Sequence, residues 1–314
     1  MSNSIGKSAQ IIGLGELLWD CFPDRRRPGG APANVAYHAQ QLGLRSAVAT
    51  RVGADELGNE ICDFLVSHGL SIQLVQIDAH RQTGTVTISP VSTAEVNYLF
   101  LENSAWDFLD LTPELIDAVS AAEAICFGTL AQRRPMARRT IQNCLQRVSQ
   151  GCLIVYDINL RAPFFVKDWI EKSFEQATIV KMNDDEVKVI SDLLKVYSSS
   201  EEEFSKTLLD RYKRLELVCV TRGEHGCLGV TCDETIELPG NRIKVVDTVG
   251  AGDAFTAAII FGCLNKWPLQ KTLDLANRFG SMVASRPGAM PSLREELTAL
   301  RSDLEWAYRT TPPV

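Results

Sequence analysis

The fold is decided by the stretch Val246-Asp247-Thr248-Val249-Gly250-Ala251-Gly252-Asp253-Ala254-Phe255. Gly250 and Gly252 flank a small residue, so the backbone can turn tightly and leave its N–H groups pointing outward. The largely apolar run 254–264 contains no Pro and predicts a buried helix. Asp253 therefore lies at a helix N-terminus, where free N–H groups and the helix dipole attract phosphate. Because its carboxylate could also accept a proton from a hydroxyl, the stretch predicts a phosphoryl-transfer site.

Asp is also a preferred capping residue, so the alternative is that Asp253 only caps a helix. The C-terminal half of the chain favours the first interpretation. After about residue 110, apolar runs at 124–128, 152–157, 179–183 and 217–221 alternate with helical stretches. This pattern is typical of a doubly wound α/β fold with a mostly parallel sheet. Ligands bind beyond the carboxyl ends of such strands, and each of these runs ends in a polar cluster.

The N-terminal third carries a second Gly-rich stretch at Gly29-Gly30, which permits close approach of the backbone to a ligand. A helix is expected from Ala33 to Gly43, and Asn34 near its start offers either an amide to a hydroxyl-bearing ligand or a cap. Residues 85–89 and 96–100 largely alternate polar and apolar side chains, as half-exposed strands do. They predict a small accessory sheet, joined by part of segment 16–28.

Composition limits the classes of partner. The chain has 314 residues and a net charge of -7, which argues against nucleic acid. Its nine cysteines are dispersed without Cys-x-x-Cys spacing, and its four histidines are isolated, so reduced thiols are expected rather than disulfides or zinc. No signal peptide or membrane span is apparent. A cytoplasmic protein without a membrane partner is expected.

Two signatures carry a resemblance to a known family. The first is Pro28-Gly29-Gly30-Ala31-Pro32-Ala33-Asn34-Val35-Ala36 with 51–58, and the second is 246–255. Asn183-x-x-Glu186 and Thr221-x-Gly223-x-x-Gly226 stand between them. Over roughly residues 10 to 295 the sequence resembles the ribokinase-like (PfkB) carbohydrate kinases. The resemblance implies a doubly wound α/β core at 10–306 with a β-sheet lid from about 16–30 and 84–106, a loose leader at 1–9 and a tail at 307–314.

The resemblance also implies roles for particular residues. Asp253 is similar to the base that accepts the proton of a sugar hydroxyl, and backbone N–H groups would hold charge on the phosphoryl at Gly250, Ala251 and Gly252. The implied sugar contacts are Asp20, Gly29, Gly30, Asn34 and Arg161. The implied ATP contacts are Asn183, Thr221, Gly223, Gly226 and Asn277. Glu186 matches a residue that organises Mg²⁺ through water. Asp247 is similar to a residue beside a monovalent cation, and K⁺ activation stays open because Val249 and Gly250 depart from ribokinase's own motif.

Within the family, the sequence is most similar to those of fructokinases. This similarity predicts phosphorylation of fructose to fructose 6-phosphate. The alternatives are a 2-keto-3-deoxygluconate kinase and a non-catalytic sugar-binding regulator with the same fold. Arg161 could serve either a carboxylate or a hydroxyl, so it does not separate the two kinases. An exposed apolar face of the accessory sheet also predicts a homodimer formed through the lids.

Overall fold

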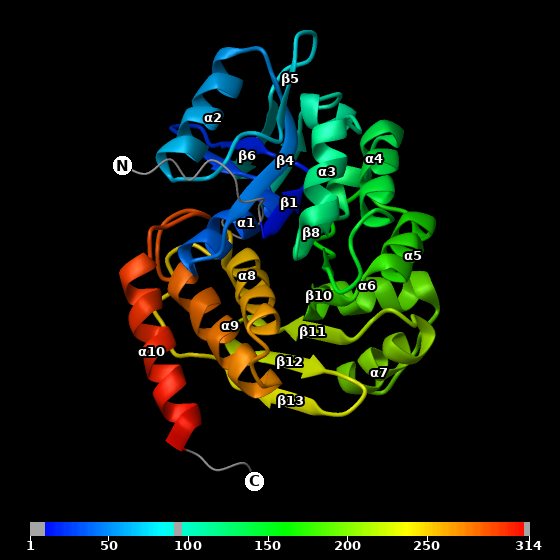
Figure 1. Ribbon diagram of the computed structural model, residues 1–314, viewed down its shortest axis with the longest axis vertical. Helices are drawn as coiled ribbons and strands as arrows, with labels where there is room; N and C mark the ends of the chain where they lie inside the picture. The colour runs from blue at the N-terminus through cyan, green and yellow to red at the C-terminus, as the bar shows by residue number, and fades with distance from the viewer. Residues whose placement is uncertain (1–9, 91–95, 311–314) are drawn as a thin grey trace.

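The computed structural model describes residues 10–90 and 96–310 (Figure 1). The leader expected at 1–9 lies outside the described residues. None of the helices in the described ranges combines the length and the apolar character that crossing a bilayer requires. All nine cysteines fall within these ranges and are free, as the sequence predicts.

A nine-stranded sheet forms the centre of the molecule. Six neighbouring pairs are parallel, and the two strands at one edge are antiparallel. In order across the sheet the strands are β13 (Thr235–Leu238), β12 (Cys227–Val230), β11 (Leu217–Thr221), β10 (Ile179–Asn183), β9 (Leu153–Asp157), β8 (Ala124–Gly128), β1 (Ile11–Leu14), β4 (Ser46–Gly53) and β5 (Val75–Asp78). The predicted mostly parallel sheet is confirmed.

Helices cover both faces of this sheet (Figure 1). One face packs against α3 (Pro113–Ala121), α4 (Pro135–Leu145), α5 (Lys167–Gln176), α6 (Asp184–Leu194) and α7 (Glu201–Arg211). The other packs against α1 (Ala31–Gln41), α2 (Glu56–Ser67), α8 (Ala251–Leu264), α9 (Leu269–Ala284) and α10 (Arg294–Thr310). Successive strand residues point to opposite faces, so Ile11 joins one apolar core while Ile12 joins the other. Burial on both faces explains why the central strands are mostly apolar.

A second sheet has four strands in the order β3 (Arg26–Gly29), β2 (Leu18–Cys21), β6 (Gly84–Pro90) and β7 (Val96–Phe100). Its outer pairs are antiparallel and β2 pairs with β6 in parallel. All four strands come from the two segments expected to form the lid. We call this sheet the lid. Residues 91–95, within the second segment, lie outside the described residues. The described part of the chain also contains three short 3₁₀ helices: η1 (Ala105–Phe108), η2 (Leu130–Gln132) and η3 (Gly223–His225).

Some helix bounds differ from those expected. α1 begins at Ala31 and α8 at Ala251, two and three residues earlier than the apolar runs suggest. In both cases a glycine with positive φ, Gly30 or Gly250, turns the chain directly into the helix. Asn34 is therefore inside α1 and does not cap it. α10 continues to Thr310, past the tail boundary expected at 306.

Candidate active site

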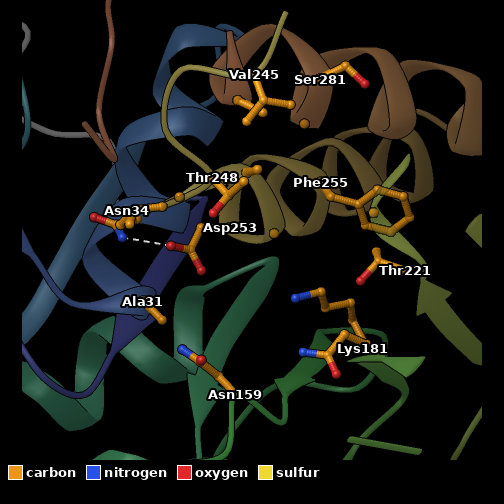
Figure 2. Close-up of a pocket in the computed structure, with 18 of the residues that line it drawn as sticks. Ala31, Asn34, Asn159, Lys181, Thr221, Val245, Thr248, Asp253, Phe255 and Ser281 are labelled. Atoms are coloured by element: carbon orange, nitrogen blue, oxygen red, sulfur yellow. Dashed lines mark hydrogen bonds between the residues drawn. The ribbon is translucent and has the colours of Figure 1, made fainter. Parts of the chain in front are cut away.

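A cavity of about 910 Å³ opens between the lid, the carboxyl ends of the parallel strands and the N-terminus of α8 (Figure 2). It brings together most of the residues expected to form the site: Asp20, Gly30, Asn34, Arg161, Asn183, Thr221, Gly223, Gly226, Gly250, Ala251, Gly252, Asp253 and Asn277. Gly29, Glu186 and Asp247 do not line it. Gly29 instead supports Asp20, because a Cβ at Gly29 would lie 2.6 Å from an oxygen of that carboxylate.

Asp253 lines the cavity from the first turn of α8 and is buried. Asn34 Nδ2 donates to its Oδ2 at 2.6 Å (Figure 2). Gly250, rather than Asp253, occupies the N-cap position, which argues against the capping alternative. Burial raises the pKa of Asp253 to about 6, and the charge of Asp157 acts in the same direction. A carboxylate with a pKa near neutrality is well suited to accept a proton.

The turn before α8 requires glycine. Gly250 has a φ of 82°, and a Cβ there would lie 2.4 Å from the carbonyl oxygen of Ala289. The first N–H groups of α8 have no carbonyl one turn earlier, so this end of the helix favours an anion. Ala251 N–H makes a long turn bond of 3.3 Å to Thr248 O, which leaves it weakly engaged.

Lys181 is a site residue that the sequence analysis missed. It lies on β10, is 7% exposed, and points its amine into the cavity below α8 (Figure 2). A Cβ at Gly252 would lie 2.7 Å from Lys181 Nζ, so the ammonium sits directly against the α8 N-terminus. Burial alone would lower its pKa, but Asp157 and other nearby carboxylates outweigh burial and raise the pKa above its ordinary value. Lys181 is thus a buried cation.

The partner of Lys181 is equally buried. Asp157 Oδ1 accepts from Lys181 Nζ at 3.2 Å, and its Oδ2 accepts from Thr256 Oγ1 at 2.8 Å. A lone Lys within the apolar run 179–183 was the available signal, because a charge in a buried strand needs a partner or a ligand.

Asn183 and Glu186 begin α6 as a reciprocal capping box. Asn183 Oδ1 accepts from Glu186 N at 2.7 Å, and Glu186 Oε2 accepts from Asn183 N at 2.8 Å. Glu186 Oε1 accepts from Leu160 N at 2.8 Å. Each carboxylate oxygen keeps a further lone pair, so Glu186 fits a water-mediated role toward Mg²⁺, which commonly uses few protein ligands. No group of three or more metal-ligating side chains occurs in residues 10–90 and 96–310.

The far end of the cavity is formed by the turn after β11 and by α9. Gly223 and Gly226 have φ of 54° and 93°, and a Cβ at Gly226 would lie 1.9 Å from the carbonyl oxygen of Leu238. Asn277 Nδ2 donates to Pro239 O at 2.8 Å. Thr221, Gly223, Gly226 and Asn277 all line the cavity.

The end of the cavity near the lid is rich in hydrogen-bond acceptors. Glu16, also missed from the sequence, is 2% exposed and its Oε2 has no partner among the described residues. Burial raises the pKa of Glu16 to about 7 and that of Asp20 to about 6. Asn34 Oδ1 is likewise buried without a partner. Arg161 is the one arginine or lysine at this end among the described lining residues, and its Nη1 donates to Leu160 O at 3.0 Å.

Asp247 does not fit the expected cation site. Its Oδ2 accepts from Arg27 Nη1 at 2.8 Å and from Gly288 N at 3.0 Å, and its Oδ1 accepts from Val249 N at 3.1 Å. A guanidinium already supplies the positive charge at this carboxylate.

The doubly wound sheet, the lid, and the cavity that ends at a helix N-terminus define the class of protein as the ribokinase-like sugar kinases. A family model described as pfkB family carbohydrate kinase matches residues 5–296, and the chain belongs to this family. It is 28% identical over 310 residues to Fructokinase-2 of Oryza sativa subsp. japonica, with 90% of each chain covered.

Solved structures agree with the fold. An uncharacterized sugar kinase from Pyrococcus horikoshii in complex with ATP is 26% identical, with a TM-score of 0.75, and the match covers 89% of this chain and 94% of that one. A fructokinase from Vibrio cholerae O395, in a form with bound fructose, ADP and calcium ion, has a TM-score of 0.79 at 23% identity, covering 93% and 98%. The chain therefore has the fold of sugar kinases along nearly its whole length.

Proposed function

We propose that the chain is an ATP-dependent fructokinase that transfers the γ-phosphoryl group to a primary hydroxyl of fructose, forming fructose 6-phosphate and ADP. The observation that carries the choice of sugar is the acceptor-rich end of the cavity. Glu16, Asp20 and Asp253 face the same space as the amide of Asn34, and carboxylates accept hydrogen bonds from sugar hydroxyls. The same carboxylates would repel a sugar acid.

Asp253 is the proposed base. As the hydroxyl oxygen attacks the γ-phosphorus, its proton moves to Asp253 and the bond from phosphorus to the β–γ bridging oxygen breaks. The hydrogen bond from Asn34 holds the carboxylate in one orientation. The lid covers the sugar with apolar side chains at Leu18, Val86 and Phe100, which would exclude water and suppress ATP hydrolysis.

Hydrogen-bond donors of this chain would stabilise the negative charge on the phosphoryl group during its transfer. Phosphoryl transfer depends mainly on positioning and electrostatic stabilisation. Lys181 Nζ lies next to Gly252, so the ammonium and the N–H groups at 250–252 are neighbours at the start of α8. Mg²⁺, held through water at Glu186, would neutralise the nucleotide phosphates when bound. The ATP complex of the 26% identical Pyrococcus kinase supports ATP as the donor. Asn277 and the turn at 223–226, which line the same cavity, are the proposed contacts of its base.

The rival substrate class is 2-keto-3-deoxygluconate. Only Arg161 offers a positive side chain near the lid among the described lining residues, and three acidic groups lie close enough to feel its charge: Glu16, Asp20 and Asp253. A non-catalytic regulator would not need the buried Lys181 beside Asp253, since burying an ammonium costs desolvation energy and Lys181 is not among the proposed sugar contacts. Both observations favour a fructose kinase.

Substrate choice is tested through Arg161. Arg161→Ala should lower kcat/KM for fructose by the equivalent of about 1–3 kcal/mol, the loss of one charge-assisted hydrogen bond. Steady-state kinetics on fructose and on 2-keto-3-deoxygluconate measure the change, with the exposed Arg139→Ala as the matched control. If the parent acts only on the sugar acid and Arg161→Ala removes more than 3 kcal/mol there, as the loss of a buried ion-pair partner would, the fructose assignment is wrong.

The homodimer remains a proposal that rests on the outer face of the lid. Leu99 on β7 is 67% exposed, while its neighbour Tyr98 lines the cavity. We expect a dimer by sedimentation at micromolar concentration, converted to monomer by Leu99→Asp because a charge would be buried at the contact. Ile77→Asp, at an apolar residue on β5 that is 58% exposed, is the control. A fully active monomeric parent would contradict the proposal.

A further inference from the structure

The ion pair between Arg27 and Asp247 joins two distant parts of the chain. Arg27 lies on β3 of the lid, and Asp247 lies three residues before Gly250, 220 positions later. Arg27 Nη1 and Asp247 Oδ2 are 2.8 Å apart, and both side chains are mostly buried, at 27% and 23% exposed. A pair with this degree of shielding is stronger than one on an open surface.

The guanidinium fills the space beside the carboxylate. Gly288 donates its N–H to the same Oδ2 at 3.0 Å, and its φ is +84°. A Cβ at Gly288 would lie 3.4 Å from Arg27 Nη1 and 3.5 Å from Arg27 Cδ, so the arginine packs directly on this backbone. A metal ion on Oδ2 would have to displace Nη1. The donor set therefore does not fit a monovalent cation.

The same contacts extend to the proposed anion-binding turn. Asp247 N–H donates to Ala284 O at 3.2 Å, and Gly250 packs so closely on Ala289 that only glycine fits. His38 Nε2 donates to the carbonyl oxygen of the same Ala289 at 2.8 Å. Arg27 thus neutralises Asp247 and packs on Gly288, so it bridges the loops 247–250 and 284–289 as a small cation at this carboxylate would.

We infer that Arg27 replaces a monovalent cation in this chain: it is a positioning residue that orders the turn before α8, and phosphoryl transfer here is independent of K⁺. The inference rests on the proposed sugar phosphorylation for its kinetic readout. It also makes a separate claim about the free protein, namely that K⁺ does not bind at Asp247 while Arg27 is present.

The kinetic experiment compares fructose phosphorylation in KCl, NaCl and choline chloride at equal ionic strength. The parent should have the same kcat in all three salts. Arg27→Ala should lower kcat about 10- to 100-fold in choline chloride, the usual effect of removing a group that orients a functional site. KM for fructose should change little, and KCl should restore part of the lost kcat by entering the vacated place. Arg26→Ala is the matched control, because Arg26 lies on the same strand but pairs with Glu60.

The second measurement needs neither sugar nor ATP. The melting temperature of each protein is recorded in the three salts, so the result stands even if fructose is not the substrate. KCl should raise the melting temperature of Arg27→Ala relative to choline chloride and leave the parent and Arg26→Ala unchanged. Activation or stabilisation of the parent by K⁺ would overturn the inference. So would an Arg27→Ala variant that retains parental kcat, or one that responds to K⁺ in neither measurement.

Discussion

Asp253→Asn is expected to lower kcat by about two to four orders of magnitude, the usual contribution of a general base. The fold and substrate binding should persist, because the amide oxygen of the new side chain can still accept the hydrogen bond that Asn34 donates at 2.6 Å. The side chain is isosteric and the first turn of α8 does not depend on it for a cap. Only the capacity to take a proton is lost.

Kinetics at saturating ATP and fructose measure the effect, and a thermal melt establishes that the variant is folded. Asp63→Asn, an exposed acid on α2, is the matched control. The parent should also lose kcat/KM as the pH falls through about 6, since a raised pKa leaves the carboxylate protonated below that value. Burial also raises the pKa values of Glu16 and Asp20 into this range, so both contribute to the loss of kcat/KM at low pH. The contribution of Asp253 is the part of this pH dependence that disappears in Asp253→Asn. Turnover within a few-fold of the parent in that variant would remove Asp253 from the mechanism.

Lys181→Met should produce the second large loss, about 10²- to 10³-fold in kcat, as expected when one donor to developing charge is removed from a shielded site. It should also destabilise the protein by about 3–5 kcal/mol, because Asp157 would be left buried without its cation. Turnover and the free energy of unfolding must therefore be measured together.

The double variant Asp157→Asn/Lys181→Met separates the two effects. Neutralising Asp157 removes the unpaired buried charge, while the new amide can still accept from Thr256. We expect stability to recover toward that of the parent while kcat stays low. If kcat recovers together with stability, Lys181 serves only to pair with Asp157.

Local patterns in the sequence predicted the strands, the Gly-rich turn and the place of Asp253. These features depend on neighbouring residues: a glycine with positive φ, an apolar run and a helix start all lie within a few positions. The start of α8 was predicted three residues too late, because Ala251 and Gly252 look more like part of the Gly-rich turn than of the apolar run that follows.

Residues whose environment comes from distant segments were harder to predict. Glu16 and Lys181 were not predicted as site residues, because their role depends on the groups that the fold places beside them. Glu16 is buried near Asp253, and Lys181 is buried beside Asp157. The pairing of Arg27 with Asp247 joins segments 220 positions apart, so local periodicity and motif spacing could not predict it. The resemblance placed Asp247 beside a possible monovalent cation, and in the structure this carboxylate pairs with the guanidinium of Arg27.

The central claim is that this chain phosphorylates fructose at the expense of ATP, and the most direct test is ATP consumption by the purified protein across a panel of sugars and sugar acids. The panel needs fructose, other neutral hexoses, 2-keto-3-deoxygluconate and a control without sugar. We predict the highest kcat/KM with fructose, fructose 6-phosphate as the product, and little ATP hydrolysis without sugar. Consumption confined to the sugar acid, or equal with and without any sugar, would contradict the claim.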